Sequence, residues 1–160
     1  MTTFNDALPD DEAAVTQLLG RPVAARFAVV VRRTDGSPVV IENEPHLRDG
    51  TPLPTLFWLV DRELLEAVSR LESTGGVHRY EDLVDPEELD AAHAAYARRR
   101  ESAVVRRDLV QPTGGVAGTR RGVKCLHAHL AYFLVGGQDP VGALVAAEVG
   151  VPPLVICEVR

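Results

Sequence analysis

Four side chains able to bind a metal or react covalently fall within six positions of this 160-residue chain. The segment Lys124-Cys125-Leu126-His127-Ala128-His129 combines an ammonium group, a thiol and two imidazoles. Thiolate and imidazole are good zinc ligands, and a cysteine beside a histidine can also act as an activated nucleophile. The segment therefore predicts a functional site, but it does not name a reaction.

A zinc site is one interpretation of this segment. On a regular helix Cys125 and His129 share a face, because they are four residues apart, while His127 projects away from both. On an extended segment all three side chains fall on one face. Either arrangement needs further ligands from distant parts of the chain. The candidate metal ligands are Cys125, His129, Cys157 and Asp61.

An anion site is the leading interpretation. The glycine-rich segment 111–122 and two arginines precede a predicted helix that begins near Lys124, the only lysine in the chain. Free backbone N–H groups, the helix dipole and nearby cations together suit a phosphate or carboxylate. The segment lacks the Gly-Lys-Ser/Thr ending of a nucleotide-binding P-loop. The expected ligand-binding residues are Lys124, Arg120, Arg121, Gly122, His127 and Glu72.

A thiol enzyme is the third interpretation, with Cys125 as nucleophile and His129 or His127 as base. A helix N-terminus and a neighbouring lysine both favour the reactive thiolate. Against this, a free cysteine is more often a small buried apolar residue. Asp61 and Cys157 also have structural explanations, as a helix N-cap and a core residue. Whether the chain is an enzyme stays open.

Composition limits the class of protein. Apolar residues make up 46% and charged residues 25% of the chain, which is typical of one globular domain. Residues 1–97 hold 8 arginines and 18 acidic residues, whereas residues 98–160 hold 9 basic and 5 acidic residues. A local basic patch on an acidic protein suits a small anion better than an extended nucleic acid. The acidic start and the lack of a long apolar run predict a cytoplasmic protein without a membrane segment.

Periodicity and turn signals predict an α+β fold with a small, mainly antiparallel sheet of about four strands covered by helices. We expect residues 1–20 to form a flexible start and an N-terminal helix, and residues 21–160 to form a single domain. His46, His78 and His93 fall in predicted loops or polar surface and receive no role. The expected strands cover 23–33, 38–42, 55–60 and 154–159, and segments 43–54 and 111–122 are expected loops. The expected helices cover 10–19, 61–74, 85 to at least 100, 124–135 and 139–149.

The string Lys-Cys-Leu-His-Ala-His resembles a motif of an actinobacterial family of unknown function, DUF501. The similarity extends to segments 49–59, 69–72 and 139–142. The resemblance implies no activity, but relatives tend to be encoded beside a septum-formation initiator and an exopolyphosphatase-like protein, which implies a protein partner in division or envelope assembly. Many relatives carry Cys-Pro after the Trp-Leu strand, where this chain has Asp61-Arg62. Zinc accepts the carboxylate that this replacement supplies.

Overall fold

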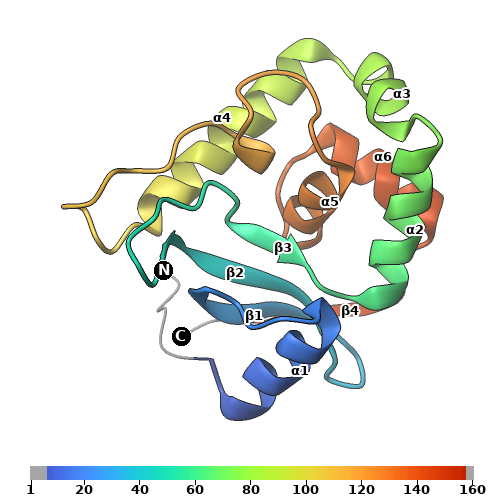
Figure 1. The fold of residues 1–160 in the computed structure, drawn as a ribbon. Coiled ribbons are helices and arrows are strands. Elements are labelled where there is room, and N and C mark those ends of the chain that lie inside the picture. The colour runs from blue at the N-terminus through green and yellow to red at the C-terminus, as the bar shows by residue number, and fades with distance from the viewer. Residues whose placement is uncertain (1–6, 158–160) are drawn as a thin grey trace.

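A four-stranded antiparallel sheet separates one helix from five others in the described part of the chain (Figure 1). The structure is a computed structural model that describes residues 7–157. The sheet has the order β3-β2-β1-β4, so β1 and β2 form its centre. The strands are β1 (Ala25–Arg33), β2 (Pro38–Leu47), β3 (Phe57–Leu59) and β4 (Leu154–Ile156). This confirms the α+β class. Residues 1–6, part of the predicted flexible start, and the last residues of the predicted final strand lie outside the described residues.

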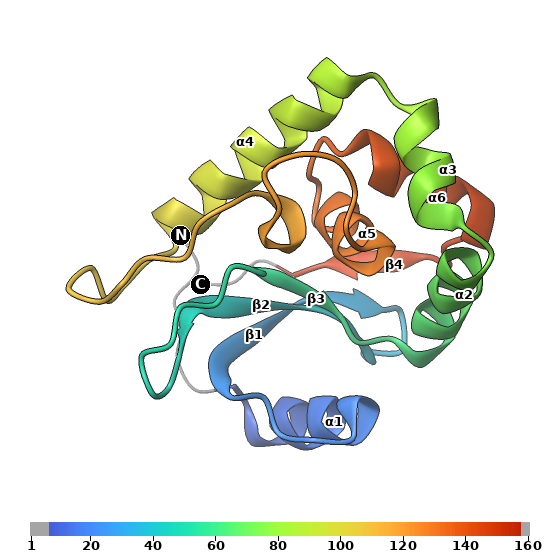
Figure 2. The same cartoon turned by 45° about the horizontal axis from the view of Figure 1, so that its top comes forward.

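The helices lie on both faces of the sheet. Figure 2 shows α1 alone on one face and α4, α5 and α6 over the other, with α2 and α3 at one side. The helices are α1 (Pro9–Leu19), α2 (Arg62–Ser73), α3 (Gly76–Leu83), α4 (Pro86–Ser102), α5 (Leu126–Leu134) and α6 (Pro140–Val149). A short 3₁₀ turn, Val116–Gly118, lies in the loop before α5. None of the helices in residues 7–157 is long and apolar enough to cross a membrane.

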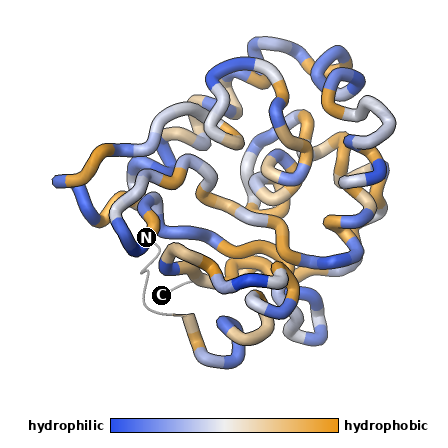
Figure 3. The backbone as a smooth tube through the Cα atoms, in the orientation of Figure 1, coloured by the Kyte–Doolittle hydropathy of each residue, from blue (hydrophilic) through white to orange (hydrophobic). Residues whose placement is uncertain are grey.

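The apolar residues form two clusters, one on each face of the sheet. The smaller cluster packs α1 against the sheet through Val15, Phe27 and Ile41, all almost fully buried. The larger cluster joins the sheet to α5, whose Leu126 and Leu130 have no exposed surface. In Figure 3 hydrophobic residues accordingly follow the strands and the helices that face them. As α5 also contacts β3, α2 and α6, its N-terminus is held from several sides.

Aspartate side chains fix the starts of three helices. Asp61 accepts a hydrogen bond from the Leu64 N–H at 3.0 Å and so caps α2. Asp85 caps α4 and Asp139 caps α6 in the same way, each followed by a proline at the first helical position. Such a cap satisfies a backbone donor that the helix itself leaves unpaired. These starts agree with the sequence prediction, because capping depends only on neighbouring residues.

Two features differ from the prediction, whereas α4, which ends at Ser102, agrees with the expected helix from 85 to at least 100. β2 continues to Leu47 and includes most of the first half of the expected loop 43–54. Helix α3 was not predicted: Gly75, at a φ of 82°, turns the chain and Gly76 starts this new helix. The Gly75-Gly76 pair therefore separates two helices, whereas the sequence pattern indicated only the end of one.

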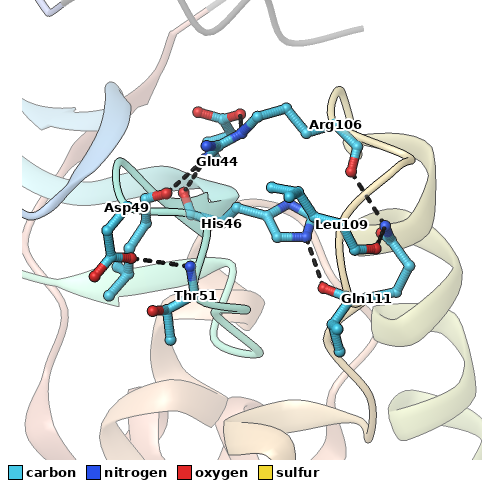
Figure 4. A network of polar contacts seen from close by, with 9 residues as sticks. Glu44, His46, Asp49, Thr51, Arg106, Leu109 and Gln111 are labelled. Carbon is cyan, nitrogen blue, oxygen red and sulfur yellow. Dashed lines mark hydrogen bonds and ion pairs between the residues drawn. The ribbon is translucent and has the colours of Figure 1, made fainter.

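A polar network fastens the segment after α4 to the end of β2 (Figure 4). Arg106 pairs with the buried Glu44 at 3.1 Å and donates to the Leu47 carbonyl at 2.6 Å. The His46 ring, which is fully buried, lies 2.9 Å from the Val110 carbonyl through Nε2. His46 is thus part of the fold, although the sequence pattern indicated a loop histidine without a role.

Candidate functional site

The start of α5 decides which of the motif's side chains meet. Cys125 is the N-cap residue of this helix, with extended backbone at φ −150° and ψ 119°, and α5 begins at Leu126. The predicted helical spacing therefore does not apply between Cys125 and the residues that follow it. The Cys125 Sγ atom lies 3.7 Å from Nδ1 of His127, two positions along the chain.

Glu72 joins these two residues from the last turn of α2. Its Oε1 atom accepts a hydrogen bond from the Leu126 N–H at 2.8 Å and lies 3.0 Å from His127 Nδ1. An acidic residue is unfavourable near the C-terminus of its own helix, but here the carboxylate reaches the positive N-terminal end of α5. This explains a residue that the sequence selected as a ligand candidate but could not place.

The two nitrogens of His127 have different surroundings. Nε2 lies 3.4 Å from the Leu65 carbonyl and 3.3 Å from the Ser69 hydroxyl. The Leu65 carbonyl and the Glu72 carboxylate both only accept hydrogen bonds, so the protonated ring satisfies both, with Nε2 donating to Leu65 and Nδ1 to Glu72. When Nδ1 loses its proton, its lone pair faces Cys125 and Glu72. Two other electron-pair donors thus face this lone pair.

The three donor atoms form one group. One ligand atom each from Glu72, Cys125 and His127 lies within 4.8 Å of the other two, and all three residues are half-buried. The hydrogen bond with Cys125 raises the pKa of His127; burial opposes this rise, and the charge of Glu72 supports it. Three such donors facing one another favour a shared cation, either a proton or a metal ion.

A pocket of about 370 Å³ lies beside this group. Cys125 and His127 form part of one wall together with Lys124. The pocket is also lined by β3 residues, including the half-buried Trp58, and by Leu19 at the end of α1. The cluster is therefore reachable by a small molecule.

His129 faces away from this pocket. Its side chain has no exposed surface, and Nδ1 lies 2.6 Å from Oδ2 of the equally buried Asp139. The other carboxylate oxygen of Asp139 accepts from the Gly142 N–H at 2.9 Å and caps α6. The Nε2 atom of His129 has no hydrogen-bond partner among residues 7–157. His129 therefore joins two helices inside the core and does not join Cys125.

His93 is a buried residue that the sequence pattern did not reveal. Its Nε2 donates to the Gly122 carbonyl at 2.9 Å, and its Nδ1 accepts from the Val116 N–H at 3.0 Å. Both nitrogens are satisfied in the neutral ring, and burial lowers the pKa of His93. Gly115 packs directly on the ring, where a Cβ atom would overlap it. Gly115, one of the glycines of segment 111–122, thus serves close packing on α4.

The predicted cations divide between two places. Arg120 and Arg121 line a separate pocket of about 320 Å³ beside His93, whereas Lys124 lines the pocket near Cys125. Gly122 has a φ of 65°, and a Cβ atom there would overlap the Glu81 carboxylate. The Glu81 carboxylate accepts a hydrogen bond from the Val123 N–H at 3.1 Å and so lies directly beside Gly122. The structure therefore does not gather the expected anion-binding set at one point.

The remaining metal candidates also lie elsewhere. Asp61 forms an ion pair with Arg33 at 2.5 Å in addition to capping α2. Burial acts to raise the pKa of Asp61, but the hydrogen bonds and charge of Arg33 outweigh it, so the pKa is lowered. Cys157 follows β4, and its N–H donates to the Val30 carbonyl at 2.8 Å. Among the described residues, the only group of three or more candidate ligands is Glu72, Cys125 and His127.

The fold and this cluster define a class: a small α+β domain with one thiol, imidazole and carboxylate group at the wall of a pocket. The chain belongs to a protein family described as "Protein of unknown function (DUF501)", whose model matches residues 29–147. The match includes Glu72, Cys125 and His127. Comparison with curated proteins and with solved structures found no match.

Proposed function

We propose that Glu72, Cys125 and His127 bind a zinc ion and that the chain is a zinc-dependent hydrolase of small molecules. The observation that carries this proposal is the meeting of three donor atoms, two of them from residues that line a pocket, Cys125 and His127. Three protein ligands and one open position are characteristic of catalytic zinc sites, whereas structural zinc sites are closed by four protein ligands.

The distances support a tetrahedral ion. Zinc bonds of about 2.3 Å to sulfur and about 2.0 Å to nitrogen place the two ligand atoms roughly 3.6 Å apart. The Cys125 and His127 ligand atoms are 3.7 Å apart. The same reasoning gives roughly 3.3 Å between nitrogen and oxygen, against 3.0 Å observed for His127 and Glu72. A shift of a few tenths of an ångström in the Glu72 carboxylate accommodates the ion.

The second sphere also suits a metal. Nε2 of His127 faces the Leu65 carbonyl, the kind of partner that fixes the orientation of a zinc-bound histidine. A water molecule bound at an open zinc position has a pKa of about 7 and supplies hydroxide at neutral pH. Zinc held by Glu72, Cys125 and His127 would therefore supply hydroxide for the hydrolysis of an ester or phosphate ester bound in the adjacent pocket.

Metal analysis of the purified, untagged protein tests this proposal. We expect about one zinc per chain, lost in Cys125→Ser and in His127→Ala and retained in Cys157→Ser. Cys157 is the matched control, because it is the other thiol of the chain and is equally half-buried. Cobalt added in place of zinc should show thiolate-to-metal charge transfer in wild type and Cys157→Ser only. If the metal-free protein takes up neither ion, the proposal fails.

A thiol hydrolase is the second candidate, favoured by the 3.7 Å contact between Cys125 Sγ and His127 Nδ1. In this case His127 takes the thiol proton, and Cys125 forms a thioester as the leaving group departs with that proton. Water then hydrolyses the thioester and restores the thiol. Metal-free protein would then be active, and iodoacetamide would modify Cys125 much faster than Cys157. Equal rates at the two thiols would exclude this candidate.

The anion-binding expectation is reduced to Lys124. Glu72 already occupies the N-terminal end of α5, where the sequence predicted an external phosphate or carboxylate. Arg120 and Arg121 line the other pocket. A small anion at the Cys125 pocket therefore depends on Lys124 and on any further cation in the same walls.

A further inference from the structure

The pocket beside Cys125 has two kinds of wall. Apolar surface comes from Leu19, Trp58, Leu59 and Ala117. Its volume of about 370 Å³ lies at the lower end of the range for small-molecule sites, roughly 300 to 1,000 Å³. An apolar body about the size of one ring fits such a space, and burying it against these side chains is favourable.

Two cations also line the pocket. Lys124 precedes the N-cap of α5, and Arg21 follows α1, with its guanidinium 5.9 Å from the centre of the Trp58 ring. Neither forms an ion pair with another residue in the described range 7–157. The protein as a whole carries a net charge of −6. Two positive side chains at one pocket on an acidic protein attract an anionic group to that place.

We propose that this pocket binds a small molecule that has a ring-sized apolar body and one phosphate or carboxylate group. The apolar body lies against Trp58 and Leu19, and the anionic group lies near Lys124 and Arg21. The inference rests on the proposed function only in that this molecule would be the substrate of the zinc site. Binding itself requires the pocket and its cations, and can be measured without metal.

Trp58 provides the measurement, because it is the only tryptophan of the chain and lies in the pocket wall. Metal-free and zinc-loaded wild-type protein are titrated with phenyl phosphate, with benzoate, with benzyl alcohol and with inorganic phosphate. We expect the first two to change the fluorescence of Trp58 with saturation. Benzyl alcohol lacks the anionic group and inorganic phosphate lacks the apolar body, so each should bind at least tenfold more weakly. Calorimetry on the same samples measures binding that leaves the fluorescence unchanged.

Charge-removing variants locate the anionic group. Lys124→Gln should weaken the binding of phenyl phosphate about tenfold, which corresponds to the loss of one charge-assisted hydrogen bond. Arg21→Gln should weaken it about threefold, because the Arg21 guanidinium also interacts with the Trp58 ring, 5.9 Å away. Arg120→Gln is the matched control: it removes the same unit of charge at the other pocket and should leave the affinity unchanged.

The outcomes separate this inference from the zinc proposal. If zinc binds but phenyl phosphate and benzoate bind no better than inorganic phosphate and benzyl alcohol, the ligand inference is wrong and the zinc proposal stands. If no zinc binds but phenyl phosphate saturates Trp58 and depends on Lys124, the ligand inference stands alone. An equal loss of affinity in Lys124→Gln and Arg120→Gln would indicate nonspecific attraction and would overturn it.

Discussion

Helix α5 carries histidines on two sides that differ in how their polar groups are paired. On the open side, His127 is half-buried beside a pocket, and its Nδ1 faces the thiol of Cys125 and the carboxylate of Glu72. On the closed side, His129 has no exposed surface and its Nδ1 is paired with Asp139. The two histidines are only two positions apart in the chain.

This difference separates a site from a structural contact. On the closed side each pairing links two elements. Asp139 caps α6 and holds His129 on α5, and His93 on α4 binds two backbone groups of the loop between α4 and α5. On the open side three donor atoms lie within 4.8 Å of one another, and the zinc proposal rests on this arrangement. The pKa shifts point in opposite directions, lowered for His93 by burial and raised for His127 chiefly by Cys125.

The largest expected effect is on the closed side. Asp139→Ala removes one partner of a fully buried pair and the cap of α6, so we expect the free energy of unfolding to fall by about 3–5 kcal/mol. On the open side, Glu72→Ala in metal-free protein should cost about 1 kcal/mol, because solvent reaches that carboxylate. Urea denaturation measures both. Equal losses would remove the distinction between the two sides.

Zinc should stabilise the protein through the open side only. At a free zinc concentration about 100 times its Kd, the free energy of unfolding should rise by about 2.7 kcal/mol. Cys157→Ser should show the same increase and Cys125→Ser none, which thermal unfolding with and without zinc would reveal. A full increase in Cys125→Ser would place the metal outside the proposed cluster.

Tyr96, a buried residue of α4, tests whether a buried polar contact without a charge also stabilises the fold. Its buried hydroxyl accepts hydrogen bonds from the N–H groups of Leu56 and Phe57, at 2.6 and 3.3 Å. Tyr96→Phe leaves both donors unpaired and should cost about 2 kcal/mol in urea denaturation. Tyr132→Phe is the control, since no protein partner of its hydroxyl is present in residues 7–157, and should change stability by less than about 0.5 kcal/mol. A similar cost in the two variants would contradict this assignment.

Local chemistry explains which parts of the fold could be predicted. The three aspartate caps and the turn at Gly36 depend on residues within a few positions, so the sequence pattern located them well. The length of β2 and the presence of α3 depend on tertiary packing. A Cβ atom at Gly76 would overlap the Leu71 carbonyl and crowd Leu126, and the latter contact is one that no local pattern reveals.

The site was predicted only in part, for two physical reasons. The first is the start of the helix. A helix that starts at Lys124 would place Cys125 and His129 on one face. Because α5 starts at Leu126, Cys125 lies beside His127 instead. The second is distance: Glu72 is more than fifty positions from its partners. His93 did have a usable signal, because the buried residues of α4 follow a helical stripe. That stripe consists of Leu89, Ala92, His93, Tyr96 and Arg100.

The smallest expected effect is a pH dependence that arises from His93. Its folded-state pKa is lowered, so the unfolded chain, with a histidine pKa near 6.5, binds the proton more readily. The His93 contribution to stability is therefore complete above about pH 6.5 and is lost as pH falls toward the folded-state pKa. Protonation of Nδ1 would also place an N–H group against the Val116 N–H.

Urea denaturation between pH 7.5 and 5 measures this dependence. Because the pKa of Asp61 is lowered, this carboxyl group stays charged throughout that range. One proton limits the slope to about 1.4 kcal/mol per pH unit. His93→Gln should have a smaller slope than wild type, whereas His78→Gln, which removes an exposed histidine, should keep the wild-type slope. The nearby charges of His129, Asp139 and Asp90 are present in both variants and cancel in the comparison. An unchanged slope in His93→Gln would mean that the closed side does not hold this ring neutral.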